Sequence, residues 1–264
     1  MAINTSAAVS PPEGRQMCPN CFGTGWRKVS PSDRRVIRCE CKLAARSQRL
    51  LDSAAIPLRY RSCTLESFIT ENADQKLIYA KNKAGMFVEQ FPIDKTGLIF
   101  EGTSGSGKTH LAIGIVKALI VDKGIPCFFC GFQELLEKIK NSYDPSVATT
   151  SMEVLRPVFD CEVVLIDDLG SVAPTGWVKD TVALILNKRY EGDKTTIITT
   201  NYQDGPPGQA EGDSDLARAR MANREQTLGD RIGERMRDRI HEMCRVIKLW
   251  GVPSYRGKPR IITR

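Results

Sequence analysis

The sequence predicts an α/β fold with a five-stranded parallel sheet in a three-layer αβα arrangement, preceded by a small N-terminal module. Short apolar runs rich in Val, Ile or Phe recur along the chain, and helical patterns lie between them. Consecutive apolar residues are typical of strands covered on both faces, and strand–helix alternation is typical of a parallel sheet between helix layers. The separate module is indicated by four of the nine cysteines, which fall within residues 17–43.

The elements of the sheet domain follow in chain order after a helix signal that begins near residue 76. The expected strands are TGLIFEG (96–102), IPCFFC (125–130), EVVLID (162–167), TTIITT (195–200) and RVIKLW (245–250). The helical patterns between them are THLAIGIVKALIVDKG (109–124), FQELLEKIKNSY (132–143) and KDTVALILNKRYEGD (179–193).

Composition divides the chain into segments. Residues 1–16 are small and polar with a Pro-Pro pair, which predicts a disordered leader, and residues 17–43 form the expected zinc-binding module. Residues 44–75 are expected to be a basic linker with a helix, followed by the main domain over 76–264. Within that domain, residues 202–226 are Gly/Pro-rich and then charged, which predicts a mobile insertion.

The net charge of +7 is unevenly distributed. Lys and Arg outnumber Asp and Glu by 11 to 4 in residues 1–62 and by 13 to 5 in 218–264, whereas the middle holds 14 against 22. Basic ends favour a polyanion such as nucleic acid, although solvated faces would have the same composition. The sequence has no signal-peptide pattern and no apolar run of membrane-spanning length, so we expect a cytoplasmic protein without a membrane partner.

The stretch GTSGSGKT fits the phosphate-binding pattern G-x-x-x-x-G-K-[ST] in full. It follows an expected strand and opens an expected helix, so backbone amides and a helix N-terminus can converge on phosphate oxygens. Lys108 would contact the β- and γ-phosphates, and the Thr109 hydroxyl would bind Mg²⁺. The expected nucleotide-binding residues are Gly102, Thr103, Ser104, Gly105, Ser106, Gly107, Lys108, Thr109 and the following His110.

Two further strand ends carry polar residues that suit this chemistry. The strand VVLID ends in Asp167, the expected outer carboxylate for Mg²⁺, and Asp168 follows as the residue to orient or deprotonate an attacking water. Asn201 ends the strand TTIITT, where an amide can position that water or sense the γ-phosphate. Each of these residues alone could equally cap a turn.

The stretch TLGDRIGERMRDRIHEMC (227–244) sets arginines at 231, 235 and 239. On one continuous helix this spacing stacks them into a ridge beside an apolar stripe. The alternative is a solvent-facing helix whose arginines pair with the acidic residues Asp230, Glu234, Asp238 and Glu242.

The order of these motifs resembles the AAA+ branch of P-loop ATPases. Within it, GERMRDRIHEMC followed by WGVPSYR resembles the C-terminal signature of the DnaC/DnaI-type helicase loaders, relatives of the IstB transposition ATPases. The resemblance implies ATP held between self-associating subunits. It places Arg239 as the arginine finger that reaches a neighbour's γ-phosphate, and Arg256 as the sensor-2 arginine that contacts nucleotide in its own subunit. Arg231 and Arg235 would then be interface or DNA contacts.

The cysteines CPNC (18–21) and CEC (39–41) form two close pairs separated by 17 residues. Four thiolates at such spacing can bind tetrahedral Zn²⁺, so the expected ligands are Cys18, Cys21, Cys39 and Cys41. Redox disulfides are the alternative. The resemblance to DnaI-type loaders implies that this module contacts the helicase. The remaining cysteines, including CFFC (127–130), are expected in the core, and neither histidine has metal-ligand spacing.

The resemblance also implies contact with single-stranded DNA. The expected contacts are Phe132, Lys138, Lys140 and Tyr143, with Phe132 as a core residue the alternative. The motifs and the resemblance together predict an ATP-dependent loader of the replicative DNA helicase, with ATP, Mg²⁺ and Zn²⁺ as its cofactors. The alternatives are an IstB-like helper of a transposase, a nucleotide-gated adaptor with little hydrolysis, and a P-loop small-molecule kinase.

Overall fold

The computed structural model describes residues 18–30, 35–70, 73–208 and 226–257. The chain divides into two compact units, Met1–Ser47 and Gln48–Arg264. The expected leader and most of the expected insertion at 202–226 lie outside the described residues. Among the described residues, no helix combines the length and apolarity that crossing a membrane requires.

The first unit contains a small hairpin. Strands β1 (Trp26–Lys28) and β2 (Val36–Arg38) pair antiparallel, and helix α1 (Glu40–Ser53) begins directly after β2. A tight turn precedes β1, in which the Phe22 amide donates to the Cys18 carbonyl oxygen at 2.8 Å. This turn and the start of α1 bring the two cysteine pairs together.

The second unit contains the predicted five-stranded parallel sheet, in the order β4-β5-β6-β3-β7. Its strands are β3 (Gly97–Gly102), β4 (Cys127–Gly131), β5 (Val163–Asp167), β6 (Thr195–Thr200) and β7 (Cys244–Leu249). Its helices are α2 (Gln75–Gln90), α3 (Lys108–Lys123), α4 (Phe132–Asn141), α5 (Ser151–Asp160), α6 (Gly176–Glu191), α8 (Leu228–Ile232) and α9 (Glu234–Met243), with 3-10 turns at Leu58–Tyr60 and Tyr255–Gly257.

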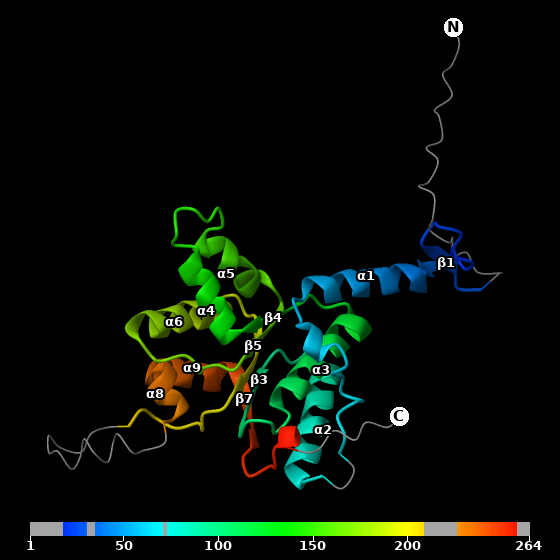
Figure 1. Cartoon of the computed structure of the whole chain (residues 1–264). Coiled ribbons are helices and arrows are strands. Elements are labelled where there is room, and N and C mark those ends of the chain that lie inside the picture. Colours follow the sequence, from blue (N-terminus) through cyan, green and yellow to red (C-terminus); the bar gives the residue numbers. More distant parts are fainter. Residues whose placement is uncertain (1–17, 31–34, 71–72, 209–225, 258–264) are drawn as a thin grey trace, which may run out of the picture. The chain divides into compact units, whose positions relative to one another are not determined.

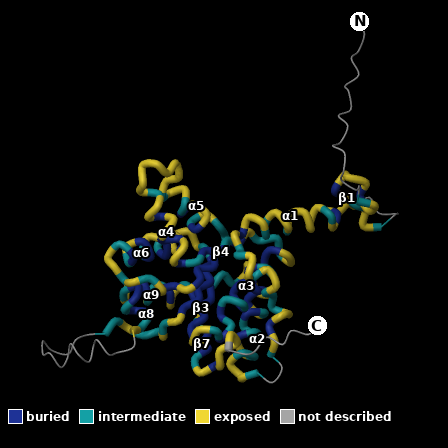
Figure 2. The backbone as a smooth tube through the Cα atoms, in the orientation of Figure 1, coloured by how far each residue is buried: buried dark blue, intermediate teal, exposed yellow. Residues whose placement is uncertain are grey.

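Helices cover both faces of the sheet, so the predicted three-layer arrangement is confirmed. Helices α2 and α3 lie on one side, and α4, α6 and α9 lie on the other (Figure 1). Side chains alternate along β3: Leu98 and Phe100 enter the core shared with α2 and α3, whereas Ile99 enters the other core. The strands form the buried centre of the unit (Figure 2), which explains their consecutive apolar residues.

The predicted single helix over 227–244 is wrong, because the structure has two helices that meet at Gly233. The φ of Gly233 is 87°, a left-handed conformation that interrupts helical hydrogen bonding and favours glycine. The apolar stripe is nevertheless buried on both helices, since Leu228, Ile232 and Met236 all lie in the core.

The break also removes the predicted arginine ridge. Arg231 is buried, and its guanidinium donates to the carbonyl oxygens of Gly170 at 2.7 Å and Val172 at 2.8 Å. Arg235 is exposed and Arg239 is half-buried. The three arginines therefore have different surroundings, and Arg231 contributes to packing.

Arg189 is a buried cation in the core between α6 and the sheet. Its guanidinium donates to the carbonyl oxygens of Val158 at 2.7 Å and Cys161 at 3.0 Å, to that of Thr195, and to the Thr196 hydroxyl at 2.9 Å. These bonds tie the end of α5 and the start of β6 to α6.

We expect Arg189→Met to lower the free energy of unfolding by about 3 kcal/mol or more, because several buried carbonyl oxygens lose their donor. Urea denaturation measures the change. The matched control is Lys188→Met, which removes an exposed cation on the same helix and should change stability by less than about 0.5 kcal/mol. Equal stability of the two variants would contradict a structural role for Arg189.

Candidate functional site

The phosphate-binding loop joins the end of β3 to the start of α3, as the sequence predicts. Gly107 precedes α3 with a φ of 96°, and a Cβ at this position would lie 2.7 Å from the Phe68 ring. A Cβ at Gly105 would lie 2.0 Å from the Ser254 hydroxyl oxygen. Both glycines are therefore needed for the close approach of neighbouring segments as well as for the turn.

Lys108 lies at the centre of the site and is buried. Its ammonium donates to the carbonyl oxygens of Gly102 at 2.9 Å and Thr103 at 2.8 Å, and to Oδ1 of Asn201 at 2.8 Å. Burial lowers the pKa of Lys108 to about 8, and the carboxylates of Asp168 and Asp167 oppose that shift. A phosphate anion beside this ammonium would favour its charged form.

Asp167 and Thr109 lie together at the start of α3. The Thr109 hydroxyl donates to Oδ1 of Asp167 at 2.8 Å, and the Thr199 hydroxyl donates to the same oxygen at 2.7 Å. Burial raises the pKa of Asp167, and these two hydrogen bonds oppose the shift. A carboxylate and a hydroxyl at this separation are oxygen ligands of the kind Mg²⁺ prefers, so these residues fit the expected ion.

Asp168 and Asn201 face each other across the ends of β5 and β6. The Asn201 amide donates to Oδ1 of Asp168 at 2.7 Å while its own oxygen accepts from Lys108. The backbone amide of Asp168 donates to the Thr199 hydroxyl at 2.9 Å, and the φ of Asp168 is 61°. Asn201 thus connects Lys108 to Asp168, the two residues expected to bind phosphate and to orient the attacking water.

The segment after β7 lies against the phosphate-binding loop. The Tyr255 amide donates to the Gly105 carbonyl oxygen at 3.0 Å, and the Thr103 hydroxyl donates to the Val252 carbonyl oxygen at 3.2 Å. Arg256 donates to the Ser104 hydroxyl at 3.4 Å. The structure therefore brings Arg256 to the loop of its own chain, and its sensor-2 role stays a prediction.

His110 has partners that sequence reasoning missed. Its Nε2 lies 3.0 Å from the Ser67 hydroxyl and 3.0 Å from the Thr64 carbonyl oxygen, and its ring packs edge-on against Phe68. Burial lowers the pKa of His110. The His110 ring contacts residues 64–68 and holds them against α3. Because the ring is engaged there, a contact of His110 with phosphate would come from the backbone amide of His110. No periodic pattern in that short, partly polar segment indicated this contact.

Arg239 lies on α9, and its guanidinium carbon is 3.9 Å from the ring centroid of Tyr190 on α6. It also pairs with Glu242 at 3.4 Å. The exposed fraction of its side chain is 23%, so the guanidinium remains accessible. Arg239 is therefore held at the α6–α9 surface by Tyr190 and Glu242, and its role as an arginine finger stays a prediction.

The four N-terminal cysteines converge as predicted. Their Sγ atoms all lie within 4.8 Å of one another, with Cys18–Cys39 at 3.8 Å and Cys21–Cys41 at 3.4 Å. Tetrahedral Zn²⁺ with Zn–S bonds of about 2.3 Å requires sulfurs separated by about 3.8 Å. The residues present therefore fit a structural zinc ion, which would hold the turn before β1 to the start of α1.

The expected DNA contacts do not form one surface. Phe132 is only 2% exposed and packs in the core, so its expected contact with DNA is wrong. By contrast, the Lys140 ammonium lies 5.0 Å from the ring centroid of Trp177, and the Trp177 indole donates to the Tyr143 hydroxyl at 3.4 Å. Trp177 was missed because it lies far along the chain from α4.

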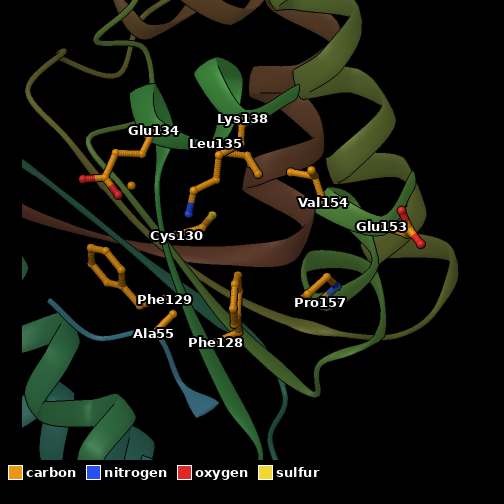
Figure 3. A pocket seen from close by; sticks show the side chains of 11 residues that line it. Ala55, Phe128, Phe129, Cys130, Glu134, Leu135, Lys138, Glu153, Val154 and Pro157 are labelled. Carbon is orange, nitrogen blue, oxygen red and sulfur yellow. The ribbon is translucent and has the colours of Figure 1, made fainter. Parts of the chain in front are cut away.

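Lys138 lies apart from that cluster and lines a pocket of about 250 Å³ beside β4. Figure 3 shows Glu134 and Lys138 on the α4 side of the pocket, with Val154 and Pro157 opposite. Strands β5 and β6 separate β4 from the phosphate-binding strand β3 in the sheet. This pocket is therefore distinct from the nucleotide site.

Fold and site together define a P-loop ATPase of the α/β class. The family model described as IstB-like ATP binding protein matches residues 40–224, so the chain belongs to that family. Membership confirms the predicted resemblance to the IstB and DnaC/DnaI group of ATPases.

Individual relatives agree with this assignment. The chain is 26% identical to the uncharacterized protein YqaM of Bacillus subtilis (strain 168) over 217 residues, covering 79% of this chain and 61% of YqaM. It is 24% identical to the replicative helicase loader DnaC of Escherichia coli (strain K12) over 233 residues, covering 88% and 85%. The crystal structure of the DnaC helicase loader superposes with a TM-score of 0.58 at 28% identity, covering 73% of this chain and 99% of that one.

Proposed function

We propose that this protein is an ATP-dependent loader of the replicative DNA helicase and acts in the cytoplasm. The observation that carries the proposal is the Lys108–Asn201–Asp168 network, a nucleotide site with a water-orienting carboxylate, on a chain that aligns with 85% of the loader DnaC. A helicase loader needs such a site to couple ATP to the binding and release of its client.

Each residue has a role in the proposed reaction. Lys108 binds the β- and γ-phosphates, and Thr109 and Asp167 hold Mg²⁺, which would neutralise phosphate charge. Asp168 orients the attacking water and accepts its proton, while Asn201 fixes the position of that carboxylate. Arg256 contacts the nucleotide from the same chain, and Arg239 approaches the γ-phosphate held by a neighbouring subunit. Hydrolysis is slow until DNA or a partner orders these groups.

Co-purification with the replicative helicase of the same organism tests the loader assignment. We expect the wild-type protein to retain the helicase when ATP is present, and Lys108→Ala to lose the ATP-dependent part of that retention. Retention of a transposase in place of the helicase would favour the IstB-like alternative. Recovery of neither the helicase nor an ATP-dependent complex would refute the loader proposal.

We also propose that the ATPase unit contacts single-stranded DNA through Lys140, Tyr143 and Trp177. Tyr143 is 61% exposed, and a cation beside two aromatic rings is the combination that binds single strands without sequence preference.

For this surface we expect the double variant Lys140→Ala, Trp177→Ala to bind labelled oligo(dT) at least tenfold more weakly, because stacking contributes about 1–3 kcal/mol per base. The slope of log K against log salt should also fall by about 0.7. Fluorescence anisotropy measures both quantities. Lys138→Ala is the matched control on the same helix and should change the affinity little. If Lys138→Ala weakens binding as much as the double variant does, the strand does not bind specifically at Lys140, Tyr143 and Trp177.

A further inference from the structure

The β1–β2 hairpin of the first unit has a face whose residues have no role in the proposed ATPase reaction. Pairing of β1 with β2 sets Trp26 opposite Arg38 and Lys28 opposite Val36. Because side chains alternate across a strand, these four lie on one face, and Arg27 lies with its partner on the other.

An aromatic ring at the surface dominates this face. Trp26 is 51% exposed, and the Arg38 guanidinium carbon lies 5.8 Å from the centroid of its ring. Val36, across from Lys28, is 55% exposed. A large ring left half in water, with a cation over it, combines a stacking surface with a positive charge.

The charge of the described residues around this face is mostly positive. The described residues of 18–47 contain six cations, Arg27, Lys28, Arg35, Arg38, Lys42 and Arg46, and one acidic residue, Glu40. Glu40 pairs with Arg27 at 3.3 Å, on the side of the hairpin away from Trp26. The field in front of Trp26 therefore favours an anionic partner.

We propose that this hairpin face, formed by Trp26, Lys28, Val36 and Arg38, binds single-stranded nucleic acid. One base stacks on the Trp26 indole, and Lys28 and Arg38 contact the phosphates on either side. The face is small, because each of its two strands has only three residues, and its size suits one stacked base with two phosphates. A stable interface with a protein would be larger, since it buries about 800 Å² on each partner. In a loader, this face would bring the strand to the module that contacts the helicase.

The proposal does not depend on the ATPase unit binding DNA, so the test observes Trp26 alone. The chain contains three tryptophans. In the full-length, zinc-loaded protein with Trp177→Phe and Trp250→Phe, Trp26 is the remaining indole. We expect saturable quenching of its fluorescence by (dT)₂₀ and less by a duplex of equal length, whose bases are already stacked. A parallel titration with (rU)₂₀ distinguishes DNA from RNA as the source of the strand.

Charge variants then test the phosphate contacts. In this background, Arg38→Ser should weaken binding severalfold and reduce the salt slope of the quenching by about 0.7. Lys188→Ser removes one exposed cation from the second unit and should leave the quenching unchanged. Zinc content, measured for each variant, verifies that the module is intact.

Three results would overturn the proposal: no quenching by either single strand in protein that contains zinc, equal quenching by duplex, or quenching that Arg38→Ser does not weaken. If the helicase quenches Trp26 and the single strands do not, the face is a protein contact. These outcomes leave the proposed ATPase and the Lys140–Trp177 surface untouched, because those are measured by other variants.

Discussion

Replacing Arg239 with alanine is expected to slow ATP hydrolysis about 10³-fold or more while leaving ATP affinity close to that of the wild type. An arginine finger neutralises charge that develops on the γ-phosphate in the transition state, and this contribution is about 10³–10⁵ in rate in known cases. Arg239 lies at the α6–α9 surface, stacked on Tyr190 and paired with Glu242, so its expected site of action is a neighbouring subunit. Steady-state phosphate release measures the rate.

A mixing experiment tests whether the arginine acts between subunits. Arg239→Ala retains a nucleotide pocket but lacks a finger, whereas Lys108→Ala retains the finger but lacks a working pocket. In head-to-tail assemblies formed at random from equal amounts, about a quarter of the junctions combine an intact pocket with an intact finger. The mixture should therefore recover activity that neither variant has. An inactive mixture of variants that still assemble would refute the shared site.

Two control variants separate charge from geometry at this position. Arg239→Lys keeps the charge but loses the planar fork that contacts two oxygens, so most of the rate should still be lost. Tyr190→Phe keeps the ring under the guanidinium and should retain nearly full activity. A fully active Arg239→Lys would show that charge alone is sufficient.

The sequence predicted those parts of the fold and site that follow from local pattern. The five strands of the parallel sheet were found because most of them are covered on both faces, which leaves an uninterrupted apolar run such as 163–166, whereas the short, exposed strands β1 and β2 were not predicted. The site residues Lys108, Asp167 and Asn201 end or follow such strands, and parallel strands bring their carboxyl ends to one edge. Their proximity could therefore be predicted from the positions of these residues at the ends of the predicted strands.

What could not be predicted depends on contacts between distant segments. The helix break at Gly233 was missed because the apolar spacing continues through it. The burial of Arg231 depends on the loop carbonyl oxygens of Gly170 and Val172, which accept its hydrogen bonds and lie about 60 residues earlier in the chain. The Lys140–Trp177 contact joins α4 to α6, and α5 and β5 lie between these two helices in the chain, so no spacing rule could indicate the contact.

Asp168→Asn is expected to slow hydrolysis by about 10²–10⁴-fold, because an amide cannot accept the proton of the attacking water. Asparagine suits the position: the φ of Asp168 is 61°, a conformation that Asn tolerates, and its oxygen can still accept from the Asn201 amide.

ATP affinity should therefore stay near the wild-type value in Asp168→Asn, measured with a fluorescent ATP analogue. Asp167→Asn is the matched control, since it alters the carboxylate that accepts from Thr109 and Thr199 and should weaken Mg²⁺-dependent binding itself. This pair of variants separates binding from turnover. If wild-type turnover, with single-stranded DNA present, is no faster than that of Asp168→Asn, then the carboxylate activates no water. The protein would then be a nucleotide-gated adaptor, in which ATP binding alone controls the client.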